Sequence, residues 1–268
     1  MNGRHDEPGV NKTGGRFLAK YLSTPTPQAS QVAIVSPELL AATLRPGDVL
    51  LIDGNSRISV AIKYLTQSTW SHAALFIGGM GISQGSGQES KVLIEADIRH
   101  GVRAVSLGEY AGLHTRICRP VGLSPDDMKK LIGHAVARIG HRYDLKNVID
   151  LARYLIPTPP VPVRWRRRMI AFGSGDPSRA ICSTMIAQAF QSVRYPILPE
   201  VSLEKADDPA CNECYREVLH IRHYSLFAPR DFDISPYFEV VKPTLLHNFN
   251  YHQIRWAADS SNLSSSTL

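Results

Sequence analysis

A helix with complete start and stop signals and only one apolar face lies near the middle of the sequence. Ser124 can cap its first turn, Pro125 suits the first helical position and Gly140 follows its end, so we predict a helix over residues 125–139. Its apolar residues recur at the spacing of one helical face, and they are Met128, Leu131, Ile132, Ala135, Val136 and Ile139. Such a helix must bury its stripe against another surface, and a β-sheet supplies a flat one.

The residues before this helix contain the strands of such a sheet. Four short apolar or alternating runs cover residues 49–52, 72–77, 91–96 and 101–107, and they predict an antiparallel meander. Helices are expected over residues 36–43, 59–65, 145–155 and 182–193. Strands followed by helices predict an α+β fold, in which a small antiparallel sheet packs against helices.

Length and composition predict one folded domain with loose ends. A chain of 268 residues with 43% hydrophobic residues has enough apolar material for a core, which excludes disorder throughout. Residues 1–30 and 259–268 lack periodicity and are expected to be disordered, which leaves one domain over residues 35–250. The sequence has neither a membrane-spanning run nor the apolar core of a signal peptide. We therefore expect a cytoplasmic protein that is at most peripheral on the inner face of the membrane.

The positive charge is concentrated in one segment. The formal net charge is +6, and residues 151–179 hold six arginines against a single acid, Asp176. Because the rest of the chain is close to neutral, we do not expect a nucleic-acid partner. Residues 157–178 form a basic flap that contains Arg164, Trp165, Arg166, Arg167 and Arg168. The flap is suited to an anionic membrane surface or an acidic substrate, and a solvated loop with a hydrophobic anchor is the alternative.

Cys182 is the first candidate for chemistry. The four cysteines are too few for a disulfide scaffold, so each is interpreted as a core residue, a ligand or a nucleophile. Cys182 follows a glycine-bearing loop and begins a predicted helix, where free N–H groups and the positive helix end lower the pKa of a thiol. A small apolar residue packed beneath the helix is the alternative interpretation.

A histidine and a carboxylate are expected to meet across two neighbouring strands. His72 opens the second predicted strand, and Glu95 lies inside the third, where an unpaired buried carboxylate would be costly. With Gly78 paired to Glu89, antiparallel register places the imidazole opposite this carboxylate. A slip of two residues would bring Asp97 there instead. A carboxylate beside an imidazole fixes its tautomer and orientation, which is the role of the third group beside a nucleophile and a base.

Six stretches of the sequence resemble the permuted papain-fold cysteine hydrolases of the NlpC superfamily. Within that superfamily the resemblance is to the YiiX-like bacterial branch, which is related to lecithin:retinol acyltransferase-like proteins. The stretches are LRPGDVLL (44–51), WSHAALFIG (70–78), VLIEA (92–96), GHRYDL (140–145), ICSTMIAQAF (181–190) and PRDFDISPYF (229–238). Papain-like enzymes normally place the cysteine before the histidine, and here the histidine comes first. The resemblance therefore implies a circularly permuted papain-like fold.

The resemblance also implies roles for four residues. Cys182 would be the nucleophile, His72 the general base and then acid, and Glu95 the group that orients the imidazole. Tyr143 would hydrogen-bond the substrate or the tetrahedral intermediate, and a half-buried structural tyrosine is the alternative. No cofactor is implied. The enzyme would act on a peptide, an amide or a lipid acyl group through a cysteine thioester, either as a hydrolase or as an acyltransferase. A noncatalytic membrane- or partner-binding module on the same fold is the competing hypothesis.

Two cysteines and two histidines towards the C-terminal end have spacing that resembles a ligand set. Cys211, Cys214, His220 and His223 form the pattern Cys-x2-Cys-x5-His-x2-His, and thiolates together with imidazoles bind zinc. The two pairs are closer together than in the usual zinc finger, and residues 207–209 indicate an exposed insertion. We therefore expect no metal site and interpret the four as surface residues.

Overall fold

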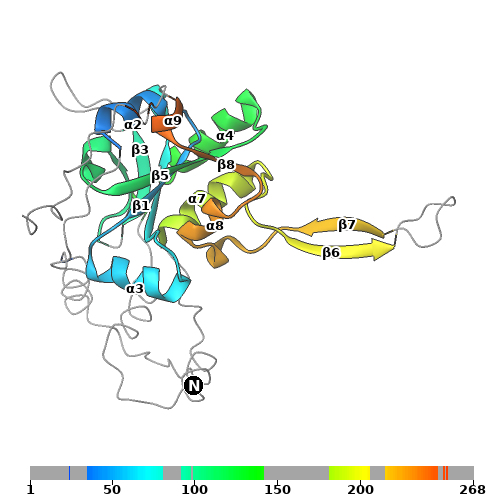
Figure 1. Cartoon of the computed structure of the whole chain (residues 1–268). Coiled ribbons are helices and arrows are strands. Elements are labelled where there is room, and N and C mark those ends of the chain that lie inside the picture. The colour runs from blue at the N-terminus through cyan, green and yellow to red at the C-terminus, as the bar shows by residue number, and fades with distance from the viewer. Residues whose placement is uncertain are drawn as a thin grey trace, which may run out of the picture.

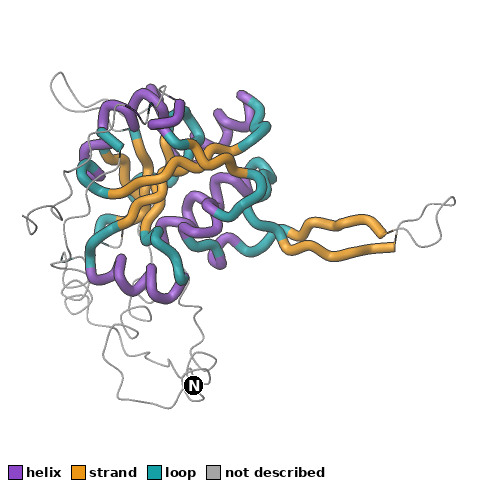
Figure 2. Tube along the Cα trace, viewed as in Figure 1, coloured by secondary structure: helices purple, strands orange, loops and turns teal. Residues whose placement is uncertain are grey.

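The computed structural model describes residues 24, 35–80, 92–97, 99–141, 181–205, 215–246, 250 and 252 of the chain. Several predictions fall outside these ranges: most of the two expected disordered ends, the helix over residues 145–155, the basic flap, Tyr143, Cys211 and Cys214. The described residues form a six-stranded sheet with helices on both faces and a two-stranded arm (Figure 1; Figure 2). The expected α+β class is confirmed.

Neighbouring strands of the six-stranded sheet run antiparallel, in the order β4-β3-β2-β1-β5-β8. The strands are β1 (Val49–Asp53), β2 (His72–Phe76), β3 (Leu93–Asp97), β4 (Gly101–Val105), β5 (His114–Pro120) and β8 (Phe238–Val241). The first four form the predicted meander, which is confirmed. The patterns do not predict β5 and β8, because β5 mixes His, Arg and Pro with its apolar residues and β8 has four residues only.

Helices cover both faces of the sheet, which is why every residue of β1 is buried. Helices α4 and α7 pack on one face, where Leu131 and Ile186 belong to the same core cluster as Leu51. Helix α2 and the 3-10 helix η2 cover the other face around Leu50 and Ala74. The helices are α2 (Pro37–Thr43), α3 (Arg57–Thr66), η2 (Leu107–Tyr110), α4 (Pro125–Val136), α7 (Ile181–Ser192), α8 (Pro229–Asp233) and α9 (Pro243–Leu246). Within the part of the chain that the structure describes, no helix is both long and apolar enough to cross a membrane.

Helix α4 begins where the sequence predicts and ends earlier. The Ser124 side chain accepts a backbone N–H of the first turn at 3.1 Å, as a helix cap does. The helix stops at Val136 rather than at Ile139, because the chain there turns back to the edge of the sheet. Gly140 has a φ of 91°, and its N–H donates to the carbonyl oxygen of Val102 in β4 at 2.8 Å. Residues Arg138 and Ile139 form tighter turns, with N–H groups that donate to the carbonyl oxygens of Ala135 and Val136 at 3.1 Å each, before the chain bonds to the sheet at Gly140.

The pairing of β2 with β3 differs by two residues from the predicted register. Leu75 lies opposite Ile94, two residues later in the chain than predicted. Apolar patterning does not prevent this slip, because a shift of two keeps every side chain on its own face. Continued along the strands, the observed register aligns His72 with Asp97, so the predicted direct opposition of His72 and Glu95 is wrong. The imidazole nevertheless contacts Glu95, which is its diagonal neighbour.

A two-stranded arm extends away from the sheet and its helices (Figure 1). Strands β6 (Glu200–Lys205) and β7 (Tyr215–His220) form this arm, and their register places Val201, Leu203, Tyr215 and Leu219 on one face. These four side chains are exposed. The sequence patterns do not predict the arm, since neither strand has the buried face on which such predictions depend.

Candidate active site

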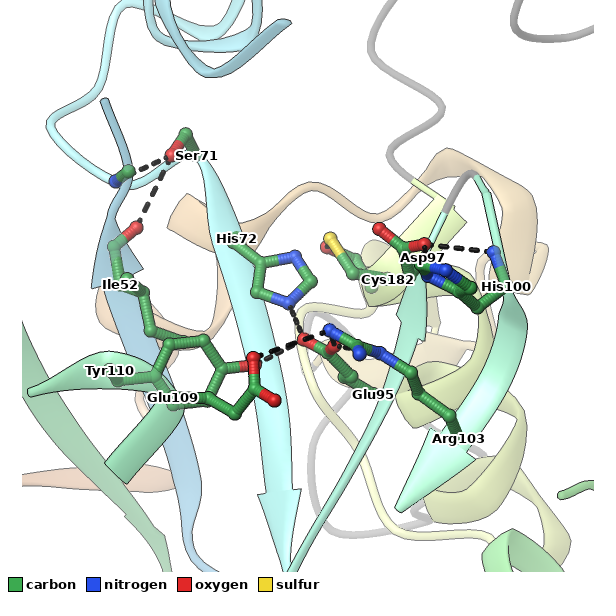
Figure 3. Close-up of polar contacts among 12 residues, drawn as sticks. Ile52, Ser71, His72, Glu95, Asp97, His100, Arg103, Glu109, Tyr110 and Cys182 are labelled. Carbon is green, nitrogen blue, oxygen red and sulfur yellow. Dashed lines mark hydrogen bonds and ion pairs between the residues drawn. The ribbon is translucent and has the colours of Figure 1, made fainter. Parts of the chain in front are cut away.

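Three elements bring His72, Glu95 and Cys182 together at one end of the sheet (Figure 3). His72 is the first residue of β2, Glu95 lies within β3, and Cys182 is the second residue of α7. Helix α7 packs against both of these strands. Residues that are far apart in the sequence therefore meet because one apolar helix covers the strands that carry the other two.

The start of β2 is fastened to the end of β1 by Ser71, the residue before His72. The Ser71 hydroxyl accepts the backbone N–H of Gly54 at 2.9 Å, and the Ser71 N–H donates to the carbonyl oxygen of Ile52 at 3.1 Å. Gly54 cannot carry a side chain here, since an added Cβ would lie 2.9 Å from the Ser71 oxygen and 2.5 Å from that of Ser59. The backbone that carries the imidazole is thus fixed on its β1 side.

Trp70 anchors the segment that leads into His72. Its indole N–H donates to the Asp233 carboxylate at 3.0 Å, and Arg116 donates to both oxygens of the same carboxylate at 2.7 and 2.9 Å. The Arg116 guanidinium also lies over the Trp70 ring, 4.9 Å from its centroid. The approach to β2 is therefore held jointly by β5 and α8.

The imidazole of His72 lies between a carboxylate and a thiol (Figure 3). Its Nε2 is hydrogen-bonded to Oε2 of Glu95, and its ring also forms a hydrogen bond with Cys182. Because Glu95 engages Nε2, the nitrogen that serves Cys182 is Nδ1. The Glu95 side chain is 4% exposed and that of His72 23%, so the imidazole is partly buried and the carboxylate almost completely.

The shifts in pKa favour a thiolate beside an imidazolium. Burial alone would raise the pKa of the Cys182 thiol, but the charge of His72 and hydrogen bonds from its ring and from the Ala73 N–H lower it below its ordinary value. Burial alone would lower the pKa of His72, but the charges of Cys182 and Glu95 raise it well above its ordinary value. Both shifts produce the activated form of a cysteine nucleophile.

Two residues that the sequence analysis missed hold the Glu95 carboxylate. Arg103, directly opposite on β4, donates from Nε to Oε1 at 2.7 Å, and its Nη2 forms an ion pair with the same oxygen at 2.7 Å. The Tyr110 hydroxyl donates to Oε2. Burial would raise the pKa of Glu95, but His72, Tyr110 and Arg103 lower it to about 2. The carboxylate therefore stays ionised. An opposite charge on the adjacent strand was an available signal for Arg103, whereas nothing in the sequence pointed to Tyr110.

Asp97, the alternative partner for His72, is engaged in the turn between β3 and β4. Its Oδ1 accepts the backbone N–H groups of Arg99 and His100 at 2.9 and 2.8 Å and contacts the His100 ring at 2.7 Å. The carboxylate that contacts the imidazole is therefore Glu95, and Asp97 orders the turn that follows it.

Cys118 has the environment of a small core residue, which is the alternative interpretation of Cys182. It lies in β5, is a free thiol and is fully buried in the sheet core, and burial raises its pKa. A thiol of this kind is unreactive at neutral pH. The two described cysteines thus differ in environment although both are buried.

The candidate zinc ligands are only partly described. His220 contacts the Ser202 hydroxyl at 2.7 Å, and His223 contacts the Ser225 hydroxyl at 2.8 Å. Among the residues for which the structure gives positions, no group of three or more His, Cys, Asp and Glu side chains could hold a metal ion.

Papain-like cysteine hydrolases use a thiol, an imidazole and a third polar group that orients the imidazole, and here the third group is a carboxylate. Residues 43–154 match the family model described as the permuted papain-like amidase enzymes of the YaeF/YiiX type, the C92 peptidase family. This match confirms, over residues 43–154, the resemblance to the permuted papain-like, YiiX-like family that the sequence predicts. The matched range contains His72 and Glu95 and ends before Cys182.

One solved structure and the curated proteins complete the comparison. A crystal structure described as metalloprotein YiiX from Escherichia coli O157:H7 aligns with 17% sequence identity and a TM-score of 0.42, covering 74% of this chain and 96% of that one. No curated protein matches the chain.

Proposed function

We propose that this protein is an amide hydrolase that works through a thioester on Cys182. The observation that carries the proposal is the buried Cys182 thiol at the start of α7, hydrogen-bonded to an imidazole that is itself held by an ionised carboxylate. The family match supports hydrolysis of an amide in general terms. A peptide bond, or an acyl bond of a lipid, is a finer substrate choice that falls within the same chemistry.

The reaction would proceed in two stages that use the same three side chains. The Cys182 sulfur attacks the amide carbonyl carbon, and its own backbone N–H in the first turn of α7 donates to the oxygen that becomes negative. His72 then gives its Nδ1 proton to the leaving nitrogen. The amine departs, and the acyl group remains on Cys182 as a thioester. In the second stage His72 takes a proton from water, hydroxide adds to the thioester, and the carboxylic acid leaves as the thiolate is restored.

The first test measures the activation of the thiol without a known substrate. The rate of alkylation by a low dose of iodoacetamide, followed by mass spectrometry, should rise with pH through a midpoint below that of an ordinary cysteine. The direction follows from the lowered pKa of Cys182, since the thiolate is the reactive form and is present at lower pH. At about pH 6, Cys182 should be labelled ahead of Cys118, whose raised pKa keeps it protonated.

The same protein should give a burst with p-nitrophenyl acetate, because acetylation of the thiol releases p-nitrophenolate before water regenerates the enzyme. Labelling of Cys182 that is no faster than that of Cys118, together with no burst, would favour the noncatalytic binding module.

A second test replaces Glu95 and distinguishes a role in orienting His72 from a purely structural role. Glu95→Gln keeps the shape but lacks the charge that holds the imidazolium, so the acetylation rate should fall by roughly 10- to 1000-fold. The matched control is Asp97→Asn on the same strand, which contacts His100 rather than His72 and should change that rate by less than about threefold. A Glu95→Gln protein that unfolds, while its folded fraction keeps the full rate, would reduce Glu95 to a core ion-pair residue.

A further inference from the structure

Glu95 is bound more completely than its contact with His72 requires. Its Oε1 accepts the Nε–H of Arg103 and forms an ion pair with Nη2 of the same guanidinium. Its Oε2 accepts the Tyr110 hydroxyl and also contacts Nε2 of His72. The three partners come from β4, η2 and β2, so the carboxylate is held from three directions. A carboxylate bound in this way cannot rotate about its last bond without breaking a charge-assisted hydrogen bond.

We propose that Arg103 and Tyr110 are positioning residues that hold Glu95 for the imidazole and adjust the ionisation of Cys182. This inference rests on the proposed function, because it concerns how that site is tuned. Arg103 is suited to the task by register as well as by charge, since it lies directly opposite Glu95 and presents a planar fork to one carboxylate oxygen.

The charges at this end of the sheet alternate in sign. The thiolate of Cys182 is followed by the imidazolium of His72, the carboxylate of Glu95 and the guanidinium of Arg103, each beside the next. Without Arg103, the negative charge of Glu95 would be balanced by His72 alone, and the potential at the thiolate would become more negative. We therefore expect loss of Arg103 to raise the pKa of Cys182.

Two further acids, Asp97 and Glu109, act on the Arg103 guanidinium. Glu109 in η2 lies 3.7 Å from the guanidinium, and the charges of Asp97 and Glu109 both act to raise the pKa of Arg103. These acids keep the guanidinium charged, and the Arg103 side chain is 34% exposed. If Arg103 served only to neutralise the buried Glu95 carboxylate, its replacement by an uncharged residue would leave the pKa of Cys182 unchanged.

The experiment compares Arg103→Met, which keeps the length and loses the charge, with Arg103→Lys, which keeps the charge and loses the fork. The readout is the pH midpoint of Cys182 alkylation by iodoacetamide. Arg103→Met should move the midpoint upwards by about one pH unit, while Arg103→Lys should stay within about 0.3 unit of the unmodified protein. Arg103→Lys should still acetylate more slowly with p-nitrophenyl acetate, because a single ammonium orients Glu95 less well.

Arg119→Met is the matched control. Arg119 makes a comparable ion pair with the buried Asp48 on the same sheet, but neither residue contacts the site. This variant should lower the melting temperature without moving the alkylation midpoint. An Arg103→Met midpoint equal to that of the unmodified protein would overturn the inference and leave the proposed function standing. An unmodified protein whose Cys182 has an ordinary midpoint would overturn the proposed function, and the inference with it.

If Arg103→Met does not fold, Tyr110→Phe tests the same inference. It removes only the hydroxyl that donates to Glu95 and keeps the ring, which is buried against the sheet. A smaller upward shift of the same midpoint supports the inference, and an unchanged midpoint together with an unchanged acetylation rate contradicts it.

Discussion

Replacement of Cys182 by serine is expected to abolish the acetylation burst, with a loss of about 10⁴-fold or more in rate. A serine hydroxyl has no ionised form at neutral pH beside an imidazole that is already protonated, so the attacking atom would be lost while its volume is nearly kept. The rate of p-nitrophenolate release and the melting temperature should be measured on the same preparation. The melting temperature should change little, because the Cys182 thiol contacts polar partners and not only apolar ones.

Cys118→Ser supplies the control for this experiment. Cys118 is buried in the sheet core, so a hydroxyl there should cost stability and leave the rate of the folded protein unchanged. Equal losses of rate in the two variants, at equal stability, would remove Cys182 from the role of nucleophile.

Replacement of His72 by alanine is expected to cost about 10³-fold or more in acetylation, since it removes both the base and the positive charge that stabilises the thiolate. With the imidazole absent, burial is the dominant influence on the thiol, and burial raises its pKa. Alkylation of Cys182 at about pH 6 should therefore disappear, and the pH midpoint should move above that of an ordinary thiol.

His100→Ala is the appropriate comparison for His72→Ala. His100 lies near the same end of the sheet, but its ring contacts Asp97 and is largely exposed (Figure 3). Its removal should leave both the burst and the alkylation midpoint almost unchanged. If the two histidine variants behave alike, the base is not His72.

The parts of the fold that the sequence predicts are those with a strong periodic pattern. Helix α4 combines a serine cap with a one-sided apolar stripe, and β1 is a short run of apolar residues that reads as buried on both faces. The meander of β1 to β4 follows because each strand is short and bounded by turn residues. Strand β5 was missed because its first three residues are only partly buried and include His114 and Arg116, which take part in a ring contact and an ion pair.

The sequence identified three residues of the site but only part of their relative placement. Cys182 was indicated by its position at the start of a helix, and His72 by its position at the start of a strand. Glu95 was indicated because an unpaired buried carboxylate is costly. The register was wrong by two residues, because the face on which a side chain lies is insensitive to such a slip. The contact with Glu95 survives the error because a glutamate side chain is long enough to reach its diagonal neighbour.

Asp233 accepts hydrogen bonds from Trp70 and Arg116 and so anchors the segment before His72. This aspartate is synthesised long after the histidine. During synthesis from the N-terminus, the meander and even the nucleophile leave the ribosome before this carboxylate exists. Long-range contacts of this kind also form late in refolding, because the intervening loop must close before they contribute. The cysteine is therefore synthesised early and its base is fixed only after residue 233, so a partly made chain carries Cys182 without a placed imidazole to activate it.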